Sequence, residues 1–429
     1  MRDRKVADKY EIHRQLLEMY RGTQAQLAGD ERQKTRLAQV KMHQAWLEQI
    51  FSSVETGKPI VYSPVYPELI YAFDLQPLFL EAWELLPLRQ DMYALCESID
   101  TAHEAGIHSD LCSFGKSLIG SLLRGKLPPP TMIVAPTFPC DNLKISYQVL
   151  GHLAAAPTYF LDHPYWMDAD GAQDYWLGQF KGLISFLEEH SGKKLDYDRL
   201  KEVVEESNRM VDYWRRVMEL RKLKPLPQGG SGLGGILTGQ TVAGLPVGTE
   251  AMKMLLDDIE ERIERKETAI ANERVRVIWF HIRIPYDREI WTWMGEMGAA
   301  VPVTFGEYSF FEPVDTSTRE SMIKGLAQRA LEVPMLRQGR GAVDLWIEDC
   351  LYAVKEWQGD CVILAGHAGC KWIRGGYGLL QDALREHGIP LLMFDIDFLD
   401  PRVSPPEEYR GRIEDFLSTV MAAKEFGRY

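Results

Sequence analysis

Short apolar runs alternate with helix-length amphipathic segments through much of the chain. Strands that alternate with helices in this way usually form parallel sheets with helices on both faces. The pattern therefore predicts an α/β fold. The runs lie at 59–63, 131–135, 158–161, 275–280, 301–304, 361–365 and 391–395.

Two other stretches carry apolar residues at helical spacing, and a glycine-rich run from Gly229 to Gly235 interrupts the second of them. We therefore expect two flavodoxin-like or Rossmann-like parallel-sheet domains together with two helical regions. The predicted parts are an N-terminal helical segment (1–57), a first α/β domain (58–172), a helical linker region (173–272) and a second α/β domain (273–429).

The composition supports a well-packed globular protein and excludes one broad function. The chain has 429 residues, of which 45% are hydrophobic and 26% charged, enough for two or three domains. Its formal net charge is −13. Proteins that bind nucleic acid in general present a basic face to neutralise phosphates. We therefore expect no nucleic-acid partner.

The chain begins with MRDRKVADKYEIHRQ, which is charged throughout and has no apolar core of a signal peptide. No apolar run reaches the length of about 18 residues that a membrane span needs. We therefore expect a cytoplasmic protein without a membrane partner. In that reducing compartment the six cysteines would be metal ligands or buried thiols rather than disulfides.

Three cysteines lie where ligand sites form in such folds. Cys140 follows the predicted strand at 131–135, and Cys370 follows the one at 361–365. Ligands bind beyond the carboxyl ends of parallel strands, so these two thiols would enter such crevices. Cys112 stands at the start of a predicted helix, where the helix dipole favours its thiolate.

The other cysteines have less informative surroundings. Cys96 and Cys350 fall in predicted helices, and Cys361 begins the strand that leads to Cys370. Free cysteine is often fully buried, so each of the three taken alone is better explained as a core thiol. No C-x-x-C pair occurs, which disfavours zinc ribbons and simple ferredoxin motifs. From spacing alone, all six remain either ligands or core thiols.

The segments around these cysteines resemble the 2-hydroxyacyl-CoA dehydratase and benzoyl-CoA reductase subunit family. The likeness rests on five segments in the same order as in the family. They are Pro67-Glu68-Leu69-Ile70, Ser109-Asp110-Leu111-Cys112-Ser113, Phe138-Pro139-Cys140-Asp141, His367-Ala368-Gly369-Cys370-Lys371, and the stretch from Gly388 to Arg402.

This resemblance implies an iron–sulfur protein. In the family a [4Fe–4S] cluster is held by three cysteines, which correspond here to Cys112, Cys140 and Cys370. The resemblance also implies low-potential electrons from a separate ATP-hydrolysing iron–sulfur activator. One departure concerns Tyr66 and Pro67, which stand where dehydratases usually carry a proline and a first glutamate. That difference puts the acid–base chemistry of the dehydratases in doubt for this chain.

The number of cysteines is similar to that of the double-cubane cluster proteins, a subgroup of the same family. Their homodimers bind a double-cubane [8Fe–9S] cluster in each subunit, and two bridged cubanes need six thiolates. On this resemblance Cys96, Cys350 and Cys361 would join Cys112, Cys140 and Cys370 as ligands. The chain would then be a homodimeric reductase of small molecules.

Two alternatives to that reductase remain. One is a dehydratase-like subunit with a single [4Fe–4S] cluster, and the other is a protein that only transfers electrons. His367 and Lys371 flank Cys370, and His108 precedes Cys112, so these three side chains are candidates for proton delivery. Gly115-Lys116-Ser117 lacks the earlier glycine of a phosphate-binding loop, which leaves ATP hydrolysis to the partner.

Overall fold

The computed structural model describes residues 9–65, 67–230, 236–307 and 312–426. Within these residues the strands form two four-stranded sheets, and all their pairings are parallel. The strand orders are β2-β1-β3-β4 and β6-β5-β7-β8, so both sheets are wound in the same way. The predicted α/β fold with two parallel-sheet domains is confirmed. The strands are β1 (Ile60–Tyr62), β2 (Gln76–Leu78), β3 (Met132–Pro136), β4 (Thr158–Leu161), β5 (Val275–Trp279), β6 (Ala299–Thr304), β7 (Cys361–His367) and β8 (Leu391–Ile396).

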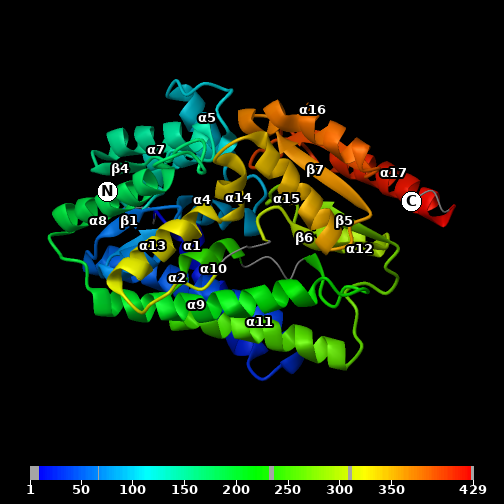
Figure 1. Cartoon of the computed structure of the whole chain (residues 1–429), viewed down its shortest axis with the longest axis horizontal. Helices are drawn as coiled ribbons and strands as arrows, with labels where there is room; N and C mark the ends of the chain where they lie inside the picture. The colour runs from blue at the N-terminus through cyan, green and yellow to red at the C-terminus, as the bar shows by residue number, and fades with distance from the viewer. Residues whose placement is uncertain (1–8, 66, 231–235, 308–311, 427–429) are drawn as a thin grey trace, which may run out of the picture.

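Helices surround both sheets (Figure 1). The N-terminal pair and the helices Tyr197–Leu220 and Pro246–Glu264 pack against one another along one side of the molecule. The helices are α1 (Glu11–Leu27), α2 (Lys34–Thr56), α3 (Pro67–Ala72), α4 (Leu80–Leu85), α5 (Cys96–Glu104), α6 (Ser113–Leu123), α7 (Asp141–Ala154), α8 (Ala172–Ser191), α9 (Tyr197–Leu220), α10 (Ile236–Thr241), α11 (Pro246–Glu264), α12 (Ile290–Glu296), α13 (Arg319–Leu331), α14 (Pro334–Gly339), α15 (Val343–Glu356), α16 (Lys371–Glu386) and α17 (Pro406–Glu425).

One apolar core joins the two sheets. Tyr62 and Ile133 of the first sheet belong to the same buried cluster as Ile278 and Leu364 of the second. The opposite faces of the two sheets have separate clusters, one beneath each sheet. Shared packing, and not only the connecting chain, therefore fixes the position of the two sheets relative to one another.

The helical regions lie where the sequence pattern places them. The region 173–272 contains α9 and α11, which run side by side beneath both sheets in Figure 1. Part of the glycine-rich run, residues 231–235, lies outside the described residues. The exact domain boundaries stay predictions.

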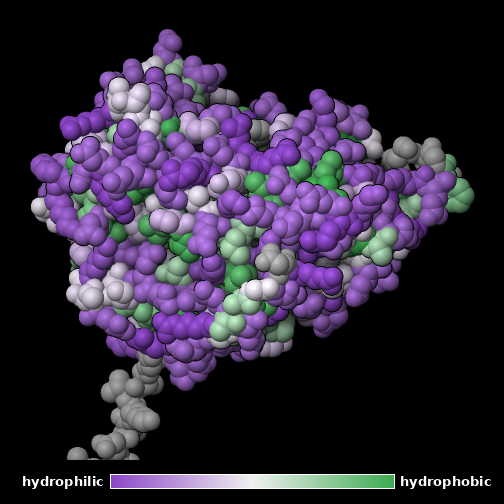
Figure 2. Space-filling model, turned by 90° about the horizontal axis from the view of Figure 1, so that it is seen from below, coloured by the Kyte–Doolittle hydropathy of each residue, from purple (hydrophilic) through white to green (hydrophobic). Residues whose placement is uncertain are grey.

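The outer surface is mainly polar. Figure 2 shows one face of the molecule, on which hydrophilic residues dominate and hydrophobic ones form small areas between them. Among the described residues, no helix combines the length and the apolar character needed to cross a bilayer.

A buried arginine connects the second sheet to the helical region. Arg276 lies in β5, and its side chain is 0% exposed. Its Nε donates to Glu273 at 2.6 Å, and its Nη1 donates to the carbonyl oxygens of Lys222 and Trp357, each at 3.1 Å. The Glu273 side chain is itself only 4% exposed. Each charge is therefore stable in the interior only while the other is present.

We predict that Arg276→Met lowers the free energy of unfolding by about 3–5 kcal/mol, because it leaves the Glu273 carboxylate buried without its partner. Arg274→Met is a matched control, since Arg274 pairs with Glu425 at the surface, with side chains 41% and 66% exposed. The control should lose less than about 1 kcal/mol. Urea unfolding followed by circular dichroism measures both values, and equal losses would contradict the prediction.

Candidate functional site

Three cysteines occupy the same local position, one residue before a helix. Cys112, Cys140 and Cys370 are the N-cap residues of α6, α7 and α16. Cys140 lies beyond the carboxyl end of β3, and Cys370 beyond that of β7. An N-cap residue is close to the free N–H groups of the first helical turn, which favour negative charge. Each thiol therefore meets the positive end of a helix, as a thiolate ligand requires.

The structure brings these three cysteines together from the two sheets. Burial raises the pKa of the Cys112 thiol well above its usual value, and the neighbouring thiols of Cys140 and Cys370 raise it further. Burial likewise raises the pKa of Cys140 to about 12, with Cys370 adding to the shift. The first-turn N–H groups of Asn142 and Leu143 act in the opposite direction. The three thiols thus surround one buried place, where a positively charged group would stabilise their thiolates.

A close backbone approach joins the Cys112 turn to the Cys370 turn. A Cβ atom built on Gly369 would lie only 3.0 Å from the Cα of Cys112 and 3.2 Å from Nε2 of His367. Real Cβ atoms rarely approach other atoms so closely, so glycine allows the two turns to touch. The turns that carry the two cysteines are therefore in direct contact across the two domains.

His367 holds this contact. The backbone N–H of Ser113 donates to Nε2 of His367 at 3.2 Å, and Nδ1 of the same ring lies 3.1 Å from the carbonyl oxygen of Ile396. These partners correspond to the neutral ring with its proton on Nδ1. Burial lowers the pKa of His367, although the nearby Asp397 opposes the shift. Both ring nitrogens are thus engaged in positioning the Cys112 turn.

The donor set fits an iron–sulfur cluster better than a single ion. Among the residues that the structure describes, no three His, Cys, Asp or Glu side chains are arranged to hold one metal ion. In an iron–sulfur cluster each cysteine binds a different iron, so the thiols surround the group without meeting at one point. Three half-buried thiols at three helix N-termini match that requirement.

The other three cysteines lie elsewhere. Cys361 begins β7 whereas Cys370 follows its end, and the seven residues of the strand separate them by about 20 Å. Cys350 belongs to the core on one face of the second sheet, and Cys361 to the core on the other face. Cys96 begins α5, where its thiol lies 3.7 Å from a carboxylate oxygen of Asp400. Burial and neighbouring thiols raise the pKa of Cys112 and Cys140. The pKa values of Cys96, Cys350 and Cys361 are raised by burial and by nearby carboxylates, not by another thiol.

Two of the proposed proton donors are exposed. Lys371 is the first residue of α16 and faces solvent. The side chain of His108 is 78% exposed, and its Nδ1 accepts the backbone N–H of Asp110 at 3.1 Å. Tyr66, where the sequence departs from the dehydratases, lies outside the described residues. Of the three candidates, His367 alone is buried beside the cysteines.

Helix α4 anchors two of the cysteine-bearing helices, which the sequence pattern does not predict. Glu84 accepts hydrogen bonds from Ser117 and Ser121 of α6. Glu81, one turn earlier, accepts a hydrogen bond from the hydroxyl of Tyr147 in α7 at 3.1 Å. The segment that contains both carboxylates has the pattern of an ordinary short amphipathic helix, so no sequence signal marks them.

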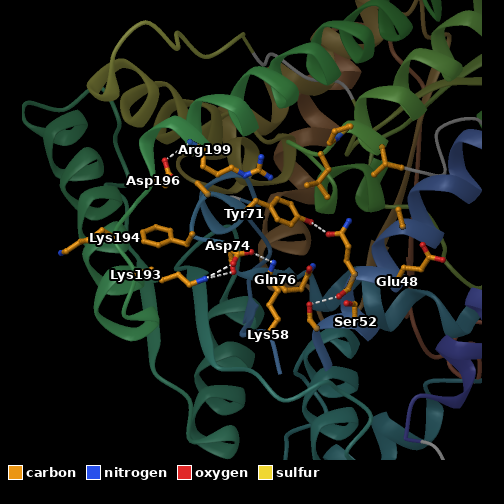
Figure 3. A pocket seen from close by; sticks show the side chains of 18 residues that line it. Glu48, Ser52, Lys58, Tyr71, Asp74, Gln76, Lys193, Lys194, Asp196 and Arg199 are labelled. Atoms are coloured by element: carbon orange, nitrogen blue, oxygen red, sulfur yellow. Dashed lines mark hydrogen bonds and ion pairs between the residues drawn. The ribbon is translucent and has the colours of Figure 1, made fainter. Parts of the chain in front are cut away.

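A large groove lies at the other end of the first sheet and does not belong to this site (Figure 3). Its volume is about 1150 Å³, and it is lined by Lys58 just before β1 and by Gln76 at the start of β2. Lys58 and Lys193 both pair with Asp74, at 2.6 and 3.1 Å. The groove therefore opens at the amino ends of the strands, whereas Cys140 follows a carboxyl end.

The chain matches the family model of the 2-hydroxyglutaryl-CoA dehydratase D-component over residues 61–420. It is 26% identical to the alpha subunit of (R)-phenyllactyl-CoA dehydratase from Clostridium sporogenes, across 77% of this chain and 81% of that protein. It is 24% identical to the alpha subunit of (R)-2-hydroxyisocaproyl-CoA dehydratase from Clostridioides difficile, across 88% and 94%. It is also 24% identical to a subunit of benzoyl-CoA reductase from Thauera aromatica, across 74% and 78%.

The buried carboxyl of Glu84 predicts a pH dependence of stability. Burial raises its pKa from 4.5 to about 7, and the hydroxyls of Ser117 and Ser121 oppose the shift. Between these values the folded state binds more protons than the unfolded state, so stability falls as the pH rises. The difference of about 2.5 pKa units corresponds to a loss of roughly 3 kcal/mol by pH 8.

Glu84→Gln should remove this loss, because the amide stays neutral. The free energy of unfolding of the variant, minus that of the unmodified protein, should therefore be larger at pH 8 than at pH 5. Urea unfolding at both pH values measures this difference. Glu97→Gln on α5 serves as the control, since the Glu97 side chain is 79% exposed. A gain of the same size in both variants would show that the effect does not arise from the buried carboxyl.

Proposed function

The chain belongs to the 2-hydroxyglutaryl-CoA dehydratase D-component family, and we propose that it is the iron–sulfur subunit of a 2-hydroxyacyl-CoA dehydratase-like enzyme. The observation that carries this proposal is the meeting of Cys112, Cys140 and Cys370 at three helix N-termini. These residues would hold one [4Fe–4S] cluster. When bound, such a cluster supplies a low-potential electron and one iron without a protein ligand.

The chain's own residues prepare the site for that group. First-turn N–H groups of α7 and α16 favour the thiolates of Cys140 and Cys370, against the effect of burial. His367 fixes the Cys112 turn through the N–H of Ser113. Cys140 and Cys370 also pack against the apolar core, whose low dielectric strengthens these electrostatic effects.

Two relatives are alpha subunits by name, which supports a second subunit in the active enzyme. Following the family resemblance, we further propose that a separate ATP-hydrolysing iron–sulfur protein delivers the electrons. A double-cubane reductase would need Cys96, Cys350 and Cys361 at the same site. The position of Cys361 at the opposite end of β7 from Cys370 supports the single-cluster alternative instead.

Iron and acid-labile sulfide in protein purified without oxygen test the cluster. We expect about four irons and four sulfides per chain. Cys112→Ala, Cys140→Ala and Cys370→Ala should each lose most of the iron, whereas Cys350→Ala and Cys361→Ala should keep it. About eight irons, with losses in all of these variants, would instead support the double cubane. A folded protein without iron would refute the proposal.

His367→Ala separates a positioning role from proton delivery. If the ring only holds the Cys112 turn, the variant should lose iron, while Lys371→Ala and His108→Ala at the surface keep it. Iron content and turnover of (R)-phenyllactyl-CoA, with activator and partner subunit of a relative, are measured on the same samples. Full iron content combined with lost turnover in His367→Ala would instead assign the ring to proton delivery.

A further inference from the structure

A second cavity lies on the same side of the sheets as the cysteines. Its volume is about 140 Å³. Ser63 and Phe79, which directly follow β1 and β2, line it together with Gly306, two residues beyond β6. The carboxyl ends of strands from both sheets therefore meet at this cavity, as they do at ligand sites of open α/β folds.

The walls of the cavity are mostly apolar. An apolar cavity of about 150 Å³ in another protein accommodates a benzene molecule, which sets the size of ligand that fits here. Burying such a group removes its apolar surface from water, which is the main source of affinity in pockets of this kind. The apolar lining residues include Val65, Met210, Trp214, Met252, Leu326 and Val333.

The charges in the wall already balance one another. Arg329 lies 3.3 Å from Glu68, and both side chains are 8% exposed. Ser207 completes this group, since its hydroxyl donates to Glu68 at 2.6 Å and accepts from Arg329 at 2.9 Å. A ligand carboxylate would therefore be buried here without a free countercharge, at a large cost in desolvation.

One buried donor remains in the wall. The Nε atom of Arg329 has no hydrogen-bond partner among the described residues. This N–H is closed off from solvent, so Arg329 contributes to the wall through its pairing with Glu68 and Ser207. The cavity thus combines a benzene-sized apolar space with charged groups that are already paired.

Helix α14 connects the cavity to the cysteines. Pro334, its first residue, lines the cavity. At its other end, a Cβ atom on Gly339 would lie 2.4 Å from the Cβ of Pro139, the neighbour of Cys140. Six helical residues span about 8 Å. One short helix therefore separates the cavity from the turn that carries Cys140.

We propose that this cavity binds the side chain of the substrate's acyl group, and that it selects an uncharged side chain up to the size of a benzene ring. The proposal rests on the function proposed above, because it assumes an acyl-CoA substrate at the cysteines. It narrows the substrate class to acyl-CoA thioesters with an aromatic or branched apolar side chain, and it disfavours those that end in a carboxylate.

Calorimetric titration of the iron-loaded protein with three thioesters tests the selection. These are 3-phenylpropionyl-CoA, acetyl-CoA and glutaryl-CoA, which lack a 2-hydroxyl group and so cannot be dehydrated. We expect 3-phenylpropionyl-CoA to bind about ten- to a hundredfold more tightly than acetyl-CoA, from burial of the ring. Glutaryl-CoA should bind no more tightly than acetyl-CoA. Equal affinity for glutaryl-CoA and 3-phenylpropionyl-CoA would overturn the proposal.

Variants that fill the cavity test whether the selectivity among the thioesters arises there. Val211→Phe and Ala330→Leu add carbon atoms to residues in its wall, and Val403→Phe is the control, since Val403 is 61% exposed. Each filling variant should bind 3-phenylpropionyl-CoA at least tenfold more weakly, whereas its affinity for acetyl-CoA should change by less than twofold. The control should change neither affinity. Equal weakening of both thioesters would place the side chain elsewhere and overturn the proposal.

The two filling variants are independent, and circular dichroism shows which of them folds, so one suffices for the comparison. Iron content measured on the same samples separates the two proposals. Selective binding by a protein without iron would refute the iron–sulfur function and support the cavity. Iron-loaded protein that binds none of the three thioesters would refute the cavity proposal alone.

Discussion

The contact between the Cys112 turn and the end of β7 is the interaction on which the site depends. Cys112 and Cys140 are in the part of the chain that forms the first sheet, whereas Cys370 follows a strand of the second. The thiols meet where the two parts touch at Gly369 and are joined by the hydrogen bond between Ser113 and His367. Gly369 allows the close approach, and the buried ring of His367 fixes the orientation of the Cys112 turn.

Helix α4 holds two of the three cysteine-bearing helices through buried carboxyl groups. Three thiols at three helix N-termini need those helices to be held against movement along their axes. Glu84 and Glu81 of α4 provide this for α6 and α7, at the cost of two carboxyls whose pKa burial raises to about 7. Such a cost in stability is common at functional sites, where the arrangement of groups matters more than their separate contributions.

The sequence predicts the two sheets well, because most of their strands are buried along their whole length and appear as continuous apolar runs. It does not predict β2, whose three residues include Pro77. It correctly places Cys140 and Cys370 just beyond the carboxyl ends of strands, because each cysteine closely follows its strand in the sequence. It does not predict that Cys350 and Cys361 belong to cores on opposite faces of the second sheet, because this depends on how the helices and strands pack. The pairing of Glu68 with Arg329, 261 residues apart, has no local signal at all.

The supply of the three cysteines by both domains has a consequence for the energetics of the fold. A group that binds all three thiolates in the folded chain, and not in the unfolded one, adds its binding free energy to the stability of the assembled domains. The shared core around Tyr62 and Leu364 holds the sheets together already, so the site exists before the group arrives. The apolar cavity beside α14 depends on the same assembly, since Ser63 and Gly306 come from different sheets. The proposed cluster site and the proposed acyl site therefore rely on one common interface between the two domains.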